Sequence, residues 1–159
     1  MRGKELVALA TEIAQDAHAG QVDKAGAPYI GHPARVAASA RDRAGEPQAD
    51  LVEAAAWLHD VVEDTDVTLD DLIERDVPRP VVTAVDALTR RPGEKSEMYY
   101  SRVAADPIAL VVKLADLADN SDPDRLVSLD EGTQARLTAK YEHARATLNE
   151  LTASPAQDT

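Results

Sequence analysis

Residues 51–64 read LVEAAAWLHDVVED, and this stretch decides the fold class that the sequence predicts. Its apolar residues follow a helical spacing, so we expect one continuous helix from about residue 50 to residue 64. At about 100° per residue, one arc of such a helix holds an imidazole and three carboxylates. These are His59, Asp60, Glu63 and Asp64.

The rest of the chain repeats the helical pattern. Asp106 and Pro107 form a cap and a first turn for the apolar run that follows, and a long final helix is expected at about 131–151. Aromatic residues make up 3% of the chain and phenylalanine is absent, so small aliphatic side chains must build the core. The sequence predicts an all-α fold, a single bundle of roughly eight helices over residues 1–152, with a flexible tail at 153–159.

Charge and composition exclude several classes of protein. The 159 residues include 17 Lys and Arg against 29 Asp and Glu, a net charge of -12. Binding to nucleic acid or to an anionic membrane needs clustered positive charge, so we expect neither partner. The absence of cysteine excludes disulfides, cysteine-ligated metals and thiol nucleophiles. The charged N-terminus resembles neither a signal peptide nor a spanning helix, which predicts a cytoplasmic protein, and a homo-oligomer stays open.

The acidic arc is expected to bind a metal ion. Burying like charges together is very costly without a cation. Asp116 lies in another mainly apolar segment, and His32 follows a glycine-rich loop. Two imidazoles and two carboxylates suit manganese, iron or zinc. The alternative is a solvated acidic helix end with His59 in the core.

The order of these residues resembles the HD-domain metal-dependent phosphohydrolases. HAGQVDKAGAPYIGHPARVA (18–37), WLHDVVEDT (57–65) and VVKLADLADN (111–120) more closely resemble the hydrolase domain of RelA/SpoT-type proteins and the small alarmone hydrolases, which include metazoan SpoT homologues. The resemblance implies that the helical bundle is an HD domain. It also implies one bound Mn²⁺, or another divalent metal, held by His32, His59, Asp60 and Asp116.

The resemblance further implies an activity and a substrate. The activity is removal of the 3′-pyrophosphate from guanosine tetra- or pentaphosphate, a small nucleotide, with Glu63 and Asp64 handling the attacking water. Asn120 matches a family position that contacts the nucleotide, and Lys24 matches a basic residue of the family's loop. Tyr141 is a third candidate for substrate binding. The alternatives are a helix-terminal asparagine, a surface lysine and a core tyrosine.

Two departures from the family concern the substrate rather than the metal. Asp23 stands where these hydrolases commonly have an arginine that stacks on guanine, and SDPDRL (121–126) follows Asn120. A carboxylate cannot supply cationic stacking, so base preference stays open. Other cations that could meet the substrate are Arg35, Arg90, Arg91, Lys95 and Lys113. The alternative functions are an HD-domain phosphatase acting on another nucleotide or phosphate monoester, and a non-catalytic nucleotide-binding module.

Overall fold

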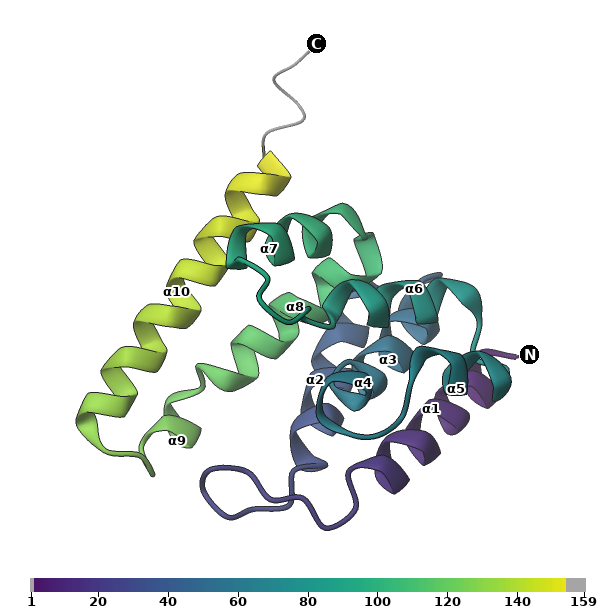
Figure 1. Ribbon diagram of the computed structural model, residues 1–159, viewed down its shortest axis with the longest axis horizontal. Helices are drawn as coiled ribbons and strands as arrows, with labels where there is room; N and C mark the ends of the chain where they lie inside the picture. The colour runs from purple at the N-terminus through teal and green to yellow at the C-terminus, as the bar shows by residue number, and fades with distance from the viewer. Residues whose placement is uncertain (1, 154–159) are drawn as a thin grey trace.

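The computed structural model describes residues 2–153, and these residues form a helical bundle (Figure 1). The helices are α1 (Gly3–Ala17), α2 (Gly31–Ala44), α3 (Ala49–Leu58), α4 (Val61–Asp64), α5 (Leu69–Glu74), α6 (Arg79–Leu88), α7 (Ser96–Ala105), α8 (Pro107–Asn120), α9 (Pro123–Leu126) and α10 (Glu131–Ala153). Within residues 2–153, α4 and α9 have four residues each and the other eight are longer. No strand forms in this part of the chain, so the predicted all-α fold is confirmed.

Small side chains allow the helices to approach one another closely at the centre of the bundle. Helix α3 contacts α1, α2, α6 and α8. Its consecutive residues Ala54, Ala55 and Ala56 are all fully buried, so helices can approach it from several sides. Leu58 ends the helix and is also fully buried. The core is therefore built mainly from Ala, Val and Leu, as the low aromatic content predicts.

The sequence-based expectation of one helix through residue 64 is wrong. Helix α3 ends at Leu58 and α4 begins at Val61, so the chain turns at His59 and Asp60. The backbone N–H of His59 bonds to the carbonyl of Ala56, three residues back, and Asp60 has φ -107° and ψ 0°. The side chains of His59, Asp60, Glu63 and Asp64 consequently do not share the regular helical arc that the spacing predicted.

Asp106 and Pro107 begin α8 as predicted. The Asp106 Oδ1 atom accepts hydrogen bonds from the backbone N–H groups of Ile108 and Ala109, at 3.0 and 2.9 Å. Pro107 occupies the first turn, where its missing N–H is not needed. This cap places the start of α8, and thereby the position of Asp116 nearly three turns later.

A loop at 18–30 connects α1 to α2 and closes on itself. Asp23 and Ala27 bond through their backbones at 2.8 Å, and the Asp23 Oδ1 atom accepts from the N–H groups of Ala25 and Ala27, each at 2.9 Å. Gly26 has φ +87°, which a side chain would disfavour. Asp23 therefore organises the loop, a role that the sequence did not predict.

The chain ends of the domain are only partly described. Helix α10 continues through Ala153 and lies along one side of the bundle, next to α7 and α8 (Figure 1). The expected tail beyond Ala153 lies outside the described residues. Among residues 2–153, no helix is both long enough and apolar enough to cross a membrane.

Candidate metal centre and substrate pocket

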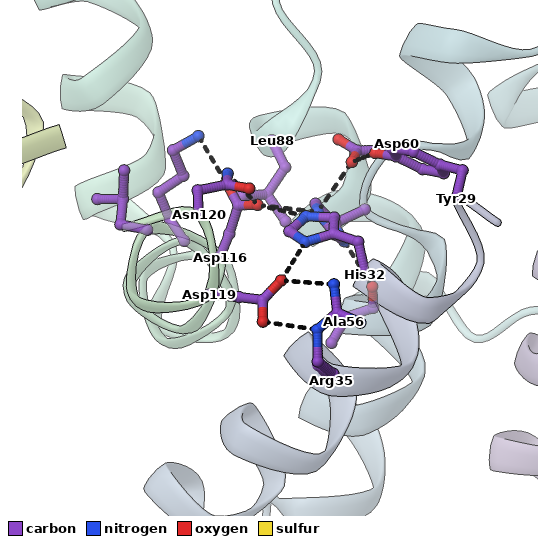
Figure 2. Close-up of polar contacts among 12 residues, drawn as sticks. Tyr29, His32, Arg35, Ala56, Asp60, Leu88, Asp116, Asp119 and Asn120 are labelled. Carbon is purple, nitrogen blue, oxygen red and sulfur yellow. Dashed lines mark hydrogen bonds and ion pairs between the residues drawn. The ribbon is translucent and has the colours of Figure 1, made fainter. Parts of the chain in front are cut away.

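Four side chains from three segments meet inside the bundle (Figure 2). They are His32 in the first turn of α2, His59 and Asp60 at the turn between α3 and α4, and Asp116 on α8. The Nε2 atom of His32 lies 2.8 Å from Oδ1 of Asp116, and Nε2 of His59 lies 3.1 Å from Oδ2 of Asp60. The structure thus brings together all four metal ligands that the sequence predicted.

Hydrogen bonding shows which nitrogen of each imidazole faces this cluster. The Nδ1 atom of His59 lies 2.6 Å from the carbonyl oxygen of Ala56, which can only accept, so Nδ1 carries the hydrogen. In a neutral imidazole, Nε2 then carries no hydrogen and has a lone pair. That Nε2 atom is buried and has no hydrogen-bond partner among residues 2–153. It faces Asp60 and also Asp116, whose Oδ1 lies 3.4 Å away.

A lone pair that faces two carboxylates in a buried site needs a positive charge between them. Although burial opposes ionisation, Asp60 and Asp116 raise the pKa of His59 well above its usual value. The same attraction is available to a divalent cation, and one donor atom each from His32, His59 and Asp60 lies within 4.8 Å of the others. Imidazole nitrogens and carboxylate oxygens are ligands for manganese, iron and zinc. These residues therefore fit a divalent metal ion.

Asp116 is held by partners on its own helix as well as by the histidines. Lys113 donates to its Oδ2 at 3.1 Å, and the amide of Asn120 donates to its Oδ1 at 3.2 Å. Although burial opposes it, Lys113 and the two histidines hold the pKa of Asp116 well below the usual range. Asp116 is therefore ionised and can serve as an anionic ligand.

Asp119, which the sequence analysis missed, supports His32 from the other side. Its Oδ2 atom lies 2.7 Å from Nδ1 of His32, and its two oxygens also accept from Nε of Arg35 and Nη1 of Arg125, each at 2.8 Å. Although burial opposes it, His32 and Arg35 lower the pKa of Asp119 to about 2. Its position in the sequence could have indicated this role, because residues three apart, such as Asp116 and Asp119, lie on the same face of a helix.

Tyr29 lies in the PYI stretch at 28–30, and its hydroxyl donates to Oδ2 of Asp60. Burial, followed by the charge and hydrogen bond of Asp60, raises the pKa of Tyr29. The phenol stays neutral and can hold this carboxylate in place. Tyr29 also lines the pocket described below, so it connects the metal-binding cluster to that pocket.

The two residues predicted to handle water lie on α4, one turn after Asp60. The carboxylate of Glu63 accepts a hydrogen bond from the backbone N–H of Arg90 at 2.8 Å, which ties α4 to the segment after α6. Burial, together with the negative charges of Asp60 and Glu63, raises the pKa of Asp64 to about 6. Both side chains are exposed, so neither belongs to the buried cluster.

A pocket of about 640 Å³ opens beside the cluster, between the 18–30 loop, the end of α8, α9 and α10. The three predicted substrate contacts, Lys24, Asn120 and Tyr141, all line it. Asp23 and two guanidinium groups, those of Arg35 and Arg125, line it as well. Its volume is in the range of small-molecule sites. Residues predicted from three separate segments therefore share one cavity.

The basic segment at 90–95 does not line this pocket. Arg91 instead bonds to the side chain and carbonyl of Asp86, at 2.7 and 2.6 Å, which closes the end of α6. The guanidinium of Arg90 stacks 4.0 Å above the ring of Tyr99.

Lys140 on α10 has a lowered pKa. Burial is the largest cause, and the positive charges of Arg90 and three other cations add to it. The other three are Lys113, Lys24 and Arg136. Four cations therefore lie close enough to Lys140 to oppose its ionisation.

The helical bundle and the adjacent residues His59 and Asp60, an HD pair at the turn after α3, together define the class of protein. The family model described as HD domain matches residues 10–105, which is more than half of the chain. The chain belongs to the HD-domain family, and the family resemblance in its sequence is confirmed.

The similar proteins narrow this class further. The chain is 35% identical over 126 residues to a probable guanosine-3′,5′-bis(diphosphate) 3′-pyrophosphohydrolase of Synechocystis sp., covering 72% of this chain and 16% of that protein. It is 34% identical over 124 residues to the Aquifex aeolicus guanosine-3′,5′-bis(diphosphate) 3′-pyrophosphohydrolase, covering 73% and 17%. A Streptomyces coelicolor GTP pyrophosphokinase is 38% identical over 120 residues, covering 70% and 14%. The chain thus spans about a sixth of the length of these curated relatives.

A solved structure matches nearly the whole chain. It is described as a metazoan ortholog of SpoT that hydrolyzes ppGpp and plays a role in starvation responses. The TM-score is 0.64 at 22% sequence identity, and the match covers 92% of this chain and 93% of that one. At this identity the likeness shows a shared fold, which agrees with the helical bundle described above.

Proposed function

We propose that this protein is a divalent-metal-dependent phosphohydrolase that removes the 3′-pyrophosphate from guanosine tetra- or pentaphosphate. One observation carries the proposal: a buried cluster of two imidazoles and two carboxylates adjoins a nucleotide-sized pocket with cationic side chains. Tyr29 and Asn120 each contact the cluster and line the pocket, so a ligand in the pocket is close to the cluster. The names of the curated relatives support the choice of substrate.

The proposed metal ligands are His32, His59, Asp60 and Asp116, and the proposed ion is Mn²⁺. Such an ion supplies a water acidic enough to attack near neutral pH, and positive charge for the phosphoryl oxygens. Asp119 and Ala56 hold Nδ1 of each imidazole, so Nε2 of each ring faces the cluster. Tyr29 holds Asp60, and Lys113 holds Asp116, in fixed positions.

The remaining residues act on water and on the nucleotide. Asp64 accepts the proton of the attacking water, while Glu63, tied to the Arg90 backbone, positions α4. Water attacks the phosphorus bonded to the ribose O3′ atom, the bond between that phosphorus and O3′ breaks, and O3′ gains a proton. Lys24, Asn120 and Tyr141 are the proposed substrate contacts in the pocket. The cytoplasmic location and a homo-oligomeric state stay predictions.

A substrate panel tests this function. The purified chain is supplied with Mn²⁺ and incubated with guanosine tetraphosphate, an adenosine analogue, simple nucleotides and a phosphate monoester, and the released product is identified. We expect intact pyrophosphate from the 3′ position of the guanosine compound. Release of orthophosphate from the monoester alone would assign the chain to another HD-domain phosphatase. Metal binding without any turnover would indicate a binding module.

A further inference from the structure

We propose that Arg125 is a specificity-determining residue, whose guanidinium recognises the base of the nucleotide and selects guanine over adenine. The inference rests on the proposed function, because it concerns the substrate of the same site. Arg125 lies on α9 in the segment 121–126 that departs from the family pattern. Its side chain lines the pocket and is 27% exposed.

One end of the Arg125 guanidinium is fixed by the protein. Its Nη1 atom donates to Oδ2 of Asp119 at 2.8 Å and to Oδ1 of Asn120 at 3.2 Å. Asp119 is itself held by His32 and Arg35. The planar group is therefore oriented before a ligand arrives, which lowers the entropic cost of binding.

The other end of the guanidinium forms an ion pair with Asp23 and makes no hydrogen bond within residues 2–153. The Nη2 atom lies 3.7 Å from Oδ2 of Asp23, beyond hydrogen-bond distance, and neither Nη2 nor Nε of Arg125 bonds to another group within residues 2–153. The Oδ1 atom of Asp23 is already occupied by Ala25 and Ala27. An N–H donor that makes no hydrogen bond and a carboxylate oxygen consequently lie side by side on the pocket wall.

This arrangement has a consequence for the base. Guanine presents two adjacent acceptors, N7 and O6, to a guanidinium, whereas adenine presents an amino donor in place of O6. Two N–H groups of one guanidinium can therefore donate to N7 and O6 of guanine. On adenine the second N–H group faces the amino group, which is also a donor, and no hydrogen bond forms there. Arg125 on α9 presents such a fork of N–H groups next to Asp23. The preference expected from one such bidentate contact is about tenfold to a hundredfold.

The test compares binding of two probes, guanosine 3′,5′-bisphosphate and adenosine 3′,5′-bisphosphate, to the Mn²⁺-supplemented chain by calorimetry. We expect the wild type to bind the guanosine probe at least tenfold more tightly. Arg125→Gln should reduce this ratio to near one. Arg125→Lys keeps the charge and loses the fork, so its ratio should fall between the two and it serves as the second variant if Arg125→Gln does not fold.

Arg35→Gln is the matched control, because Arg35 also bonds to Asp119 and lines the pocket but has no contact with Asp23. We expect this variant to keep the guanosine-to-adenosine ratio of the wild type. Equal affinities in the wild type, an unchanged ratio in both Arg125 variants, or an equal loss in Arg35→Gln would overturn the inference. Selective binding of the guanosine probe without hydrolysis of guanosine tetraphosphate would retain the inference and contradict the proposed function.

Discussion

The carboxylate of Asp119 lies 2.7 Å from Nδ1 of His32, on the side of the imidazole that faces away from the metal-binding cluster. Asp119 is ionised, so Nδ1 of His32 donates a hydrogen bond to it. Nε2 lies 2.8 Å from the ionised Asp116 and would supply its lone pair to the proposed ion after giving up its proton. Carboxylates in this position orient a ligating imidazole and increase its basicity. Figure 2 shows His32 between Asp116 and Asp119.

Replacing Asp119 should therefore weaken metal binding. We expect Asp119→Asn to lower the affinity for Mn²⁺ about tenfold to a hundredfold, because the neutral amide can present a donor to Nδ1 and no longer fixes the tautomer. Calorimetric titration of the metal-free chain measures this change. Asp42→Asn, at an exposed carboxylate on α2, is the matched control. An Asp119→Asn variant that binds Mn²⁺ as tightly as Asp42→Asn would refute the role.

Removing the HD pair should abolish metal binding. The double change His59→Ala and Asp60→Ala deletes one imidazole and one carboxylate from the cluster and leaves only His32 and Asp116 as ligands. We expect the wild type to hold nearly one metal ion per chain and the double variant to hold almost none. Elemental analysis of protein purified in the presence of Mn²⁺ measures both. Equal metal contents would mean that the ion binds elsewhere.

The residues on α4 should affect turnover and leave the metal in place. Asp64→Asn removes the proton acceptor, so we expect kcat to fall by about two to four orders of magnitude with normal metal content. Glu63→Gln keeps an acceptor for the N–H of Arg90, so the local fold is retained while a charge near the water is lost. We expect it to lose most turnover as well. Full activity in either variant, with metal content measured in parallel, would exclude that residue from the reaction.

The ion pair between Glu94 and Arg102 should make stability depend on pH. The hydrogen bond from Arg102 lowers the pKa of Glu94 from 4.5 to about 2. Because the pKa of Glu94 is lower in the folded chain than its ordinary value of 4.5, the ionised carboxylate stabilises the fold at pH values above 4.5. This contribution is lost as the pH falls toward 2. Urea unfolding should show that Glu94→Gln is less stable than the wild type near neutral pH, with the difference shrinking between pH 4.5 and about 2.

Glu97→Gln provides the comparison, because Glu97 is an exposed carboxylate on α7, the helix that carries Arg102. Its difference from the wild type should stay small over the whole pH range. A Glu94→Gln variant whose deficit is the same at pH 2 and at neutral pH would show that shape, rather than charge, explains the effect.

Local patterns predicted most of the fold, and the family resemblance implied four metal ligands whose side chains the structure brings together. Helical periodicity and the cap at Asp106 are properties of neighbouring residues, so the sequence alone reveals them. The turn at His59 and Asp60 was missed because apolar spacing continues across it into α4. The preference for one unbroken helix was therefore an error of local reasoning about a site where the chain departs from regular geometry.

The remaining errors concern residues whose partners lie far away in the sequence. Asp119 meets His32 across 87 positions, and Arg125 approaches Asp23 across the pocket. Nothing in the periodicity of α8 or of residues 121–126 encodes these approaches, because they depend on how α2, α8 and the loop pack. Asp23 is a local exception. The sequence analysis considered only its effect on the base, whereas its side chain also bonds to Ala25 and Ala27 within its own loop.

The placement of Asp119 between His32 and Arg125 has one more consequence. A single carboxylate contacts an imidazole of the proposed ion site and a guanidinium of the pocket, so we expect the two proposed binding equilibria to be coupled. Coupling of this kind is reciprocal. By whatever factor the nucleotide changes the affinity for the ion, the ion must change the affinity for the nucleotide by the same factor.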